Sequence, residues 1–586
     1  MKSLLSGNGA VARGAWEAGC RVAAAYPGTP STEILENIIT YPEISAEWAV
    51  NEKVALEVAA GACFSGVRAI TAMKHVGLNV AADPFFTMSY SGVTGGFVVV
   101  SADDPGMWSS QNEQDNRHYG RHAKVPIFEP SDSNEAKIFT QLAFDISETF
   151  DTPVLLRLTT RICHSTCVVE LGRRTEFPPK GYAKDTKKRL ALPAHARRLH
   201  VIIEGRLKKL AAFSETFPHN RIEWGEKNLG IITSGISYQY ARDVWPDASF
   251  LKLSLTHPIP ENLIKKFARA VKKIFVVEEG DAILETEVKA LGIKVVGKDR
   301  IPSCGELTPD ILRRSFSRKQ KKETQQHIPA RPPVLCPGCP HRPVFHIMKK
   351  LKLAVIGDIG CYTLGALPPL SSMDTCICMG ASVTNAHGLE KALGADFGKK
   401  AVAILGDSTF YHSGITGLVN AVYNKGHLTL VIVDNYTTAM TGHQPHPGTG
   451  KLAHGDRGIR VPPEQIARGC GVEYVNVVNP DNLEDVEAAF KEALAHDGVS
   501  VLIFRRPCAL LLKPKTPYYV DPELCKGCEL CMQIGCPALS LRHPDERKKP
   551  LAVIDPTLCF GCGLCAQVCT CDAIVLSATT STQETV

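Results

Sequence analysis

The sequence predicts an α/β protein of several domains, built on parallel sheets and ending in a small cysteine-rich domain. Its 586 residues exceed the roughly 250–300 residues at which a single hydrophobic core stops growing. Strand-like runs alternate with helix-like runs over most of the chain, a pattern typical of parallel sheets covered by helices. Nine of the 21 cysteines lie between Cys525 and Cys571, in short runs that leave little room for a hydrophobic core.

The composition argues against several classes of protein. Apolar residues make up 44% and charged residues 22% of the chain, as in ordinary globular domains. No long apolar run is present, so we expect no membrane-spanning helix, and the N-terminal residues lack the apolar core of a signal peptide. The net charge of +6 is small for this length, and no basic patch carries the aromatics of a nucleic-acid site. We therefore expect a cytoplasmic protein whose clustered cysteines serve redox or metal chemistry.

The alternating pattern divides the chain into four folded segments and a tail. Residues 1–170, 171–325 and 330–514 each show the strand and helix runs of an α/β unit. Residues 515–575 form the cysteine-rich domain, and the polar residues 576–586 predict a disordered tail.

Two cysteine motifs in the fourth segment match the two runs of a two-cluster bacterial-type ferredoxin. Three closely spaced thiolates hold three irons of a [4Fe-4S] cubane, and the fourth ligand comes from the other run. The first run has one extra residue before its last cysteine, and the second has Thr570 where proline is usual. Paired zinc sites are the alternative, disfavoured because zinc usually takes two separated pairs of ligands. The predicted ligands are Cys525, Cys528, Cys531 and Cys569 for one cluster and Cys559, Cys562, Cys565 and Cys536 for the other.

A second site is predicted where two buried strands of the third segment end. One strand ends at Gly406-Asp407-Ser408, and the next ends at Asn435, 28 residues after Asp407. Such strand ends meet at one edge of a parallel sheet, where α/β folds bind ligands. A Mg²⁺ ion that holds a diphosphate needs oxygen ligands, which Asp407, Asn435 and the backbone carbonyl of Thr437 can supply. The pattern resembles the Gly-Asp-Gly…Asn motif of thiamine diphosphate enzymes, with Ser408 replacing the second glycine; a simple helix N-cap is the alternative.

Glu52 is the candidate activator of this cofactor. Thiamine enzymes use a glutamate that faces the aminopyrimidine ring and promotes the tautomer that deprotonates the thiazolium carbon. Glu52 lies in a helix-like run at 46–62, among small apolar neighbours. A solvated glutamate on a helix is the alternative. The residues around Glu52 match a known enzyme family, described next, and this match favours the activating role.

The chain resembles the 2-oxoacid:ferredoxin oxidoreductases over essentially its whole length, and among them the large subunits of the indolepyruvate-oxidising members. The matching segments include AYPGTPSTEI at 25–34, NEKVALEVAAGA at 51–62, DDPGMWSSQNEQDNR at 103–117, CPGCPHR at 336–342 and NYTTAMTGHQPHPGTG at 435–450. The resemblance implies a pyrimidine-binding domain, a transketolase C-terminal-like domain, a diphosphate-binding domain and a ferredoxin domain, in that order.

The resemblance also implies a reaction and its partners. The expected reaction is oxidative decarboxylation of indole-3-pyruvate, or a related aryl 2-oxoacid, with coenzyme A, which gives the acyl-coenzyme A, CO₂ and reduced ferredoxin. A smaller beta subunit is expected to complete the enzyme, and ferredoxin to accept the electrons. A pyruvate or 2-oxoglutarate enzyme remains open within the family. A non-oxidative thiamine-dependent decarboxylase is a further alternative, although it would have no use for eight cluster cysteines.

Three residues are candidates for contacts with the substrate. Thr29 matches the substrate-contacting threonine of the family, and a turn residue before Pro30 is the alternative. In pyruvate-using relatives an arginine of this domain pairs the substrate carboxylate, and no clear counterpart is found between Val98 and Ser110. His75 and Arg117 are the candidates considered in its place.

Four further cysteines form a candidate third [4Fe-4S] site. Cys336 and Cys339 form a Cys-Pro-Gly-Cys pair, Cys361 follows 22 residues later, and Cys508 lies beyond the thiamine motif. Pyruvate-oxidising relatives hold a proximal cluster with four cysteines in a similar order, and this resemblance implies a third cluster here. The alternatives are a tight turn with buried structural cysteines and a zinc site.

Overall fold

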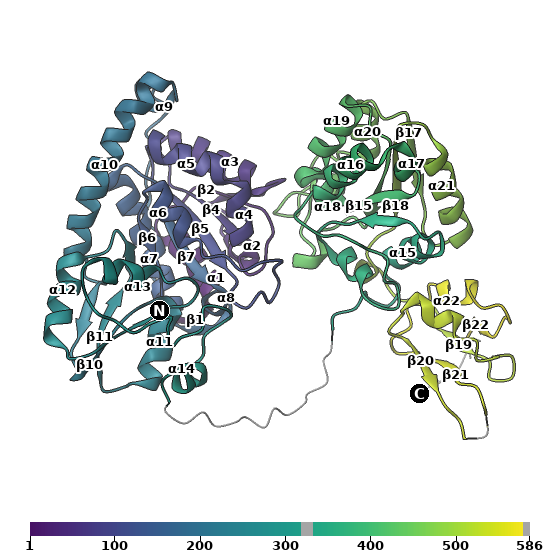
Figure 1. The fold of residues 1–586 in the computed structure, drawn as a ribbon. Coiled ribbons are helices and arrows are strands. Elements are labelled where there is room, and N and C mark those ends of the chain that lie inside the picture. Colours follow the sequence, from purple (N-terminus) through teal and green to yellow (C-terminus); the bar gives the residue numbers. More distant parts are fainter. Residues whose placement is uncertain (318–331, 546, 578–586) are drawn as a thin grey trace, which may run out of the picture. The chain divides into compact units, whose positions relative to one another are not determined.

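The computed structural model describes residues 1–317, 332–545 and 547–577. The chain forms two compact units, Met1–Gln325 and Gln326–Val586, each with its own sheets and core (Figure 1). The predicted boundary between residues 325 and 330, and the predicted tail from residue 578 onward, lie outside the described residues. None of the helices described is both long and apolar enough to cross a membrane.

The first unit contains a seven-stranded sheet. Six of its strands run parallel to one another, and β12 joins at one edge, antiparallel to β6. Every residue of β4, β5 and β7 is buried, as expected of parallel strands covered on both faces. In spatial order the strands are β12 (Leu255–His257), β6 (Ile127–Phe128), β7 (Val154–Thr159), β5 (Phe97–Asp103), β4 (Ala69–Lys74), β2 (Val22–Ala25) and β3 (Ser45–Trp48).

The helices of this sheet follow the expected alternation. Side-chain caps begin three of them, because the oxygens of Ser6, Asn51 and Asp132 accept bonds from the free amides of the first turn. The principal helices are α1 (Gly7–Glu17), α2 (Thr32–Ile38), α3 (Glu52–Phe64), α4 (His75–Val80), α5 (Ala82–Ser91), α6 (Arg117–Ala123) and α7 (Ser133–Phe150). Two short strands, β1 (Lys2–Ser6) and β8 (Thr166–Glu170), pair antiparallel beside them.

A second, four-stranded sheet completes the first unit. Its strands are β13 (Ile274–Val277), β10 (Glu226–Ser234), β11 (Ala248–Leu253) and β9 (Arg221–Glu223), with β9 antiparallel to β11. Around it lie α11 (Gly235–Val244), α12 (Glu261–Ala270), α13 (Ile283–Ala290) and α14 (Pro309–Phe316), and the long helix α10 (Pro193–Thr216) contacts both α5 and α12. Because β12 follows β11 directly and enters the seven-stranded sheet, the first two predicted segments share strands.

The second unit begins with a five-stranded sheet, parallel throughout. In spatial order its strands are β14 (Ala354–Ile356), β15 (Ala401–Gly406), β16 (Leu428–Asp434), β18 (Val499–Arg505) and β17 (Tyr474–Val478). Its main helices are α15 (His341–Lys350), α16 (Ala381–Leu393), α19 (Ile415–Tyr423), α20 (Pro463–Gly469) and α21 (Leu483–Ala495). The predicted strand ends at Gly406 and Asn435 therefore lie at the carboxyl edge of neighbouring strands.

The cysteine-rich region has two antiparallel pairs of strands. β19 (Tyr518–Val520) pairs with β22 (Ile574–Leu576), and β20 (Leu539–Arg542) pairs with β21 (Leu551–Ile554). A single helical turn, α22 (Leu564–Gln567), lies between them. The small core of this cysteine-rich region contains cysteines beside only a few aliphatic side chains. The predicted fold class, parallel α/β domains followed by a small cysteine-rich domain, is confirmed.

Candidate functional site

Asp407 lies at the carboxyl edge of the five-stranded sheet, directly after β15. Its side chain is 5% exposed and accepts hydrogen bonds from the loops around it. The Ser408 amide donates to Oδ1 over 2.8 Å, and the Asn435 amide donates to Oδ2 over 3.1 Å. The Thr437 amide donates to Oδ1 of Asn435 over 3.2 Å, which orients that carboxamide. The structure thus brings the predicted Mg²⁺ ligands Asp407, Asn435 and Thr437 into one loop cluster.

Two charged neighbours at this edge were not predicted from the sequence. Nε2 of His446 lies 3.1 Å from Oδ2 of Asp407. Burial opposes ionisation of Asp407, but the charge of His446 and its hydrogen bond outweigh burial and lower the pKa of the carboxyl. Burial and then the charge of Asp407 raise the pKa of Asp434 to about 6. Each carboxylate also has a basic partner, His446 for Asp407 and Arg505, over 2.7 Å, for Asp434.

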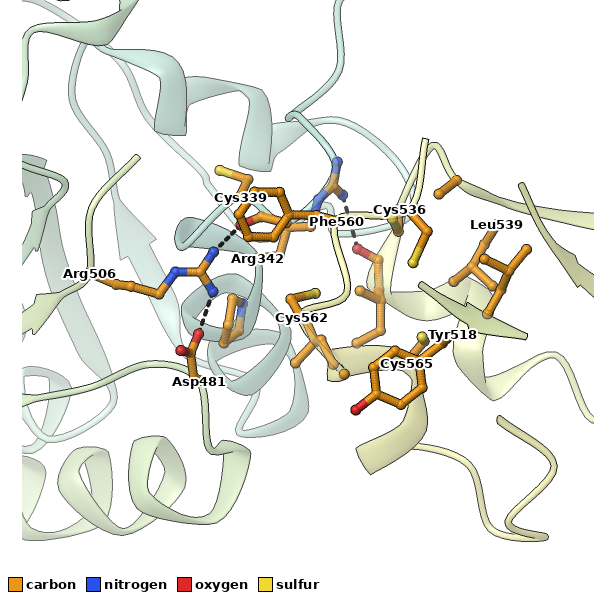
Figure 2. Close-up of a pocket in the computed structure, with 18 residues that line it drawn as sticks. Cys339, Arg342, Asp481, Arg506, Tyr518, Cys536, Leu539, Phe560, Cys562 and Cys565 are labelled. Carbon is orange, nitrogen blue, oxygen red and sulfur yellow. Dashed lines mark hydrogen bonds and ion pairs between the residues drawn. The ribbon is translucent and has the colours of Figure 1, made fainter. Parts of the chain in front are cut away.

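Each predicted ferredoxin quartet lines one cavity. Figure 2 shows the first cavity, which is lined by Cys536, Cys559, Cys562 and Cys565. The second is lined by Cys525, Cys528, Cys531 and Cys569, together with Cys571. Sγ of Cys571 lies 3.7 Å from Sγ of Cys569.

This arrangement fits a cubane. Each of its thiolates binds a different iron, so the four ligands surround a cavity instead of meeting at a point. Gly527, Gly561 and Gly563 adopt positive φ of 62°, 75° and 73°, which the tight loops between these cysteines require. No group of three or more His, Cys, Asp or Glu side chains suited to a single metal ion occurs among the described residues. The predicted Mg²⁺ ligands do not form a group of this kind, because only one of them, Asp407, is a His, Cys, Asp or Glu side chain.

The four cysteines of the candidate third site also lie near one another. Burial, followed by the charges of Cys508 and Cys336, raises the pKa of the Cys361 thiol to about 11. Burial raises that of Cys339 to about 12, and Cys336 and Cys361 act in the same direction. The Cys508 amide donates to the carbonyl of Asn435 over 3.0 Å. The third quartet is therefore attached directly to the Asp407 site, and Cys339 also lines the first ferredoxin cavity.

Glu52 is the first residue of α3, a position fixed by the Asn51 cap before it. Its side chain is 5% exposed. Gly77, in the first turns of α4, approaches it so closely that a Cβ on the glycine would lie 2.6 Å from Oε1 of Glu52. The predicted activator is thus a buried and sterically confined carboxylate rather than a solvated one.

Lys74, which ends β4 near Thr29, was not predicted from the sequence as a site residue. Its side chain is 9% exposed, and Nζ donates to the carbonyl of Ser109 over 2.5 Å. Oγ of Ser109 donates to the carbonyl of Thr29 over 3.2 Å. Burial lowers the pKa of Lys74 to about 8, although Asp104 and Glu52 oppose the shift. No ion pair of Lys74 occurs among the described residues.

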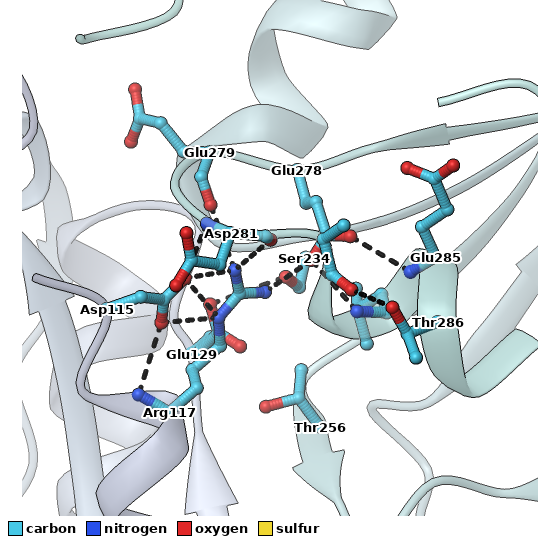
Figure 3. Close-up of polar contacts among 12 residues, drawn as sticks. Asp115, Arg117, Glu129, Ser234, Thr256, Glu278, Glu279, Asp281, Glu285 and Thr286 are labelled. Carbon is cyan, nitrogen blue, oxygen red and sulfur yellow. Dashed lines mark hydrogen bonds and ion pairs between the residues drawn. The ribbon is translucent and has the colours of Figure 1, made fainter. Parts of the chain in front are cut away.

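Arg117 belongs to a different network. Its side chain is 1% exposed, and it forms ion pairs of 2.5 Å with Asp115 and 2.7 Å with Glu278, as Figure 3 shows. It also donates to the backbone carbonyls of Glu279 and Asp281. Because its donors are engaged there, Arg117 joins the two sheets of the first unit and is not placed to bind a substrate.

His75, the other candidate for the substrate carboxylate, is also enclosed. Its side chain is fully buried, and Nε2 lies 3.1 Å from the carbonyl of Asn112. Burial lowers the pKa of the imidazole, although the charge of Asp103 opposes the shift. A neutral, enclosed imidazole is a weaker partner for a carboxylate than the neighbouring ammonium of Lys74.

Two family descriptions match the chain. "Pyruvate flavodoxin/ferredoxin oxidoreductase, thiamine diP-bdg" covers residues 13–205, which include Glu52, Lys74 and Thr29. "Thiamine pyrophosphate enzyme, C-terminal TPP binding domain" covers residues 358–504, which include Asp407 and Asn435.

Curated relatives match along most of the chain. The indolepyruvate oxidoreductase subunit IorA of Archaeoglobus fulgidus is 44% identical over 580 residues, which is 92% of this chain and 92% of that protein. The subunit of the same name from Thermococcus kodakarensis is 42% identical over 593 residues, again 92% of each. Among solved structures, the 2-oxoglutarate:ferredoxin oxidoreductase of Magnetococcus marinus has 18% identity and a TM-score of 0.45, over 53% of this chain and 64% of that one.

Proposed function

The chain belongs to the family of indolepyruvate oxidoreductase subunits IorA, and we propose that its substrates are indole-3-pyruvate and related aryl 2-oxoacids. It is a thiamine diphosphate-dependent oxidoreductase of 2-oxoacids with ferredoxin as the redox partner. In the proposed reaction, the 2-oxoacid, coenzyme A and two oxidised ferredoxins give the acyl-coenzyme A, CO₂, a proton and two reduced ferredoxins. Two electrons leave the substrate, and each ferredoxin takes one.

The observation that supports an oxidative reaction is the direct hydrogen bond between Cys508 and the thiamine motif. The Cys508 amide is hydrogen-bonded to the carbonyl of Asn435, and Cys339 of the same quartet lines the next cysteine cavity. The third quartet thus adjoins both the diphosphate edge and the first ferredoxin cavity. A decarboxylase that releases an aldehyde would need no such path for electrons.

Thiamine diphosphate, when bound, supplies the electron sink for loss of CO₂, and the chain's residues hold and orient the reactants. We assign Asp407, Asn435 and the Thr437 carbonyl to Mg²⁺, because hydrogen bonds hold these three residues in one buried loop cluster and Mg²⁺ prefers oxygen ligands. We assign Glu52 to face the pyrimidine ring, because its carboxylate is buried and confined by Gly77.

The substrate would meet side chains of the first unit. Lys74 offers a buried ammonium that forms no ion pair among the described residues, although Asp104 and Glu52 are near enough to oppose the lowering of its pKa, and an ammonium is a suitable partner for a substrate carboxylate. Thr29 adjoins it through Ser109. Trp108 is 69% exposed on the loop that carries Ser109, and its ring offers a stacking surface to an indole or phenyl group. The exposed ring of Trp108 supports an aryl substrate over pyruvate.

We also propose that a second, smaller subunit completes the enzyme in the cytoplasm. The relatives that match along 92% of the chain are named as subunits. On this proposal the chain alone is inactive or nearly so, and coexpression with the partner restores turnover. Full activity of the chain by itself would contradict the proposal.

The substrate proposal is tested by anaerobic assay of the complex. Methyl viologen or ferredoxin reduction is followed with indolepyruvate, phenylpyruvate, pyruvate and 2-oxoglutarate, with and without coenzyme A. We expect kcat/KM for the two aryl substrates to exceed those for the others by at least tenfold, and reduction to require coenzyme A. A preference for pyruvate or 2-oxoglutarate would contradict the proposed aryl substrate and would indicate a different 2-oxoacid for this chain.

A further inference from the structure

Arg342 lies between the third quartet and the first ferredoxin cavity. It follows the Cys336–Cys339 loop at the start of α15, and its side chain is 2% exposed. Nε donates to the carbonyl of Cys336 over 3.1 Å, and Nη2 donates to that of Leu335. Nη1 reaches the other way, to the carbonyl of Gly535 over 2.6 Å. One guanidinium therefore connects the loop of the third quartet to the loop that ends in Cys536 (Figure 2).

The two loops are also in direct contact. Phe560, between Cys559 and Cys562, lies against the Cys-Pro-Gly-Cys turn, where a Cβ on Gly338 would come within 2.4 Å of its ring. Gly338 has φ of 68°, so glycine suits the turn in conformation as well as in space. Arg506 donates to the Gly338 carbonyl and stands 5.8 Å from the centroid of Phe560. The two cysteine sites are thus neighbours with a packed interface.

The charge of Arg342 has no carboxylate to balance it among the described residues. Cys339, Cys536 and Cys562 line the same cavity as Arg342, and Cys336 is hydrogen-bonded to it through its backbone carbonyl. A buried cation without a counter-charge is costly. Four thiolates around a [4Fe-4S] core leave a net negative charge, so two loaded clusters would supply the missing counter-charge from both sides of the guanidinium.

We propose that Arg342 is a positioning residue for electron transfer, which holds the proximal cluster and the cluster of Cys536, Cys559, Cys562 and Cys565 together and raises the reduction potential of both. The proposal rests on the proposed function, since it needs clusters in both quartets. A reduced cluster is more negative than an oxidised one, so a nearby fixed cation favours the reduced form. The cluster of Cys525, Cys528, Cys531 and Cys569 occupies a cavity that Arg342 does not line, and it serves as an internal reference.

The test separates the charge of Arg342 from its hydrogen bonds. Arg342→Gln keeps a donor but removes the charge, and Arg342→Lys keeps the charge but loses the fork of donors. Arg506→Gln is the matched control, because Arg506 adjoins the same interface but is paired with Asp481. Each protein is purified anaerobically with its partner subunit, and the potentials are measured by EPR-monitored redox titration.

We expect Arg342→Gln to lower the potentials of the two adjacent clusters relative to the reference cluster. The expected change is about tenfold in the electron-sharing equilibrium, or about 59 mV for a one-electron couple. Arg342→Lys should restore the potentials, and Arg506→Gln should change them less than threefold. A fully loaded Arg342→Gln protein with unchanged potentials would overturn the proposal, as would lowered potentials in Arg342→Lys.

The iron content of the wild-type complex separates failure of this proposal from failure of the proposed function. About twelve irons per chain are expected for three cubanes, and about eight would remove the proximal cluster and with it the role of Arg342. The substrate assay is independent of that count. If Arg342→Gln loses its clusters, the potentials of Arg342→Lys decide: wild-type values support the charge effect and lowered values contradict it.

Discussion

Gly77 leaves Glu52 almost no clearance, because a Cβ on the glycine would lie 2.6 Å from Oε1 of the glutamate and 2.7 Å from its Cγ. Gly77 lies within α4 and does not have a positive φ, so space, not backbone conformation, requires the glycine here. The confinement holds the carboxylate in one place at the start of α3. An activating acid that must face one atom of a cofactor benefits from such confinement.

Gly77→Ala is therefore expected to impair turnover by displacing Glu52. We expect kcat to fall at least tenfold, which corresponds to about 1.4 kcal/mol, with thiamine diphosphate still bound. Glu52→Gln should have the larger effect, again with the cofactor retained, because the amide cannot exchange the proton. Steady-state kinetics and a thiochrome assay of bound cofactor measure both quantities.

Gly61→Ala is the matched control for this series. Gly61 lies in α3 as well, but a Cβ there meets nothing within 4 Å. The substitution should leave kcat unchanged and stabilise the helix by about 0.5–1 kcal/mol. If Glu52→Gln retains turnover within tenfold of wild type, Glu52 is not the activator.

The oxygen cluster at the sheet edge predicts a metal-dependent effect. Asp407→Ala and Asn435→Ala each remove an oxygen ligand, so both variants should lose thiamine diphosphate on gel filtration at Mg²⁺ concentrations that keep the wild type loaded. Asp396→Ala, at an exposed position on the same unit, should retain the cofactor. Full retention in both Asp407→Ala and Asn435→Ala would mean that Mg²⁺ is held elsewhere.

Lys74 predicts an effect on substrate binding. Lys74→Met removes the buried ammonium, so KM for an aryl 2-oxoacid should rise at least tenfold while bound cofactor is unchanged. Lys74→Arg should recover much of the loss. Lys53→Met is the control, because Lys53 is exposed and its partner is Glu57.

The pH dependence of KM gives this prediction a second readout. Burial lowers the pKa of Lys74 to about 8, so the ammonium is present below that pH and is lost as the pH rises through it. KM of the wild type should therefore rise above about pH 8, whereas KM of Lys74→Arg should stay flat. The same rise in both proteins would assign the titration to another group.

The parts of the site that could be predicted from the sequence are those that depend on the spacing of residues within one motif or strand. The cluster quartets follow from cysteine spacing, because three ligands on one short loop leave few geometries, and the structure places each quartet around one cavity. Asp407 and Asn435 follow from strands that end in polar residues at one sheet edge. Both predictions concern residues within a strand, a turn or a motif.

Contacts between distant segments could not be predicted in this way. From the sequence alone, Lys74 would be taken for a solvated lysine. Its hydrogen-bond partner Ser109 lies 35 positions away in the chain, and only the fold brings the two together. Arg342 looks like the end of a cysteine motif, yet its donors reach Gly535. Arg117 was considered for the substrate carboxylate because of its charge, and only the fold shows Asp115 and Glu278 around it. β12 likewise joins a sheet that its own segment does not build.

The attachment of Cys508 to Asn435 leads to a prediction about coupling. The amide of Cys508 is bonded to the Asn435 carbonyl over 3.0 Å, and its Sγ lies 3.8 Å from Nε2 of His443. If Cys508 ligates the proximal cluster, Cys508→Ala should lower the iron content from about twelve to about eight per chain. Because electrons then lack their first acceptor, CO₂ release should continue with release of the aldehyde in place of ferredoxin reduction.

Two measurements on the same sample check this outcome: CO₂ released per substrate consumed, and methyl viologen reduced per CO₂. The second ratio should fall at least tenfold in Cys508→Ala and stay at the wild-type value in Cys470→Ala. Cys470 is a suitable control because it is partly buried at the end of α20, outside all three quartets. Wild-type iron near eight, together with unchanged coupling in Cys508→Ala, would show that the four cysteines of the third quartet are structural.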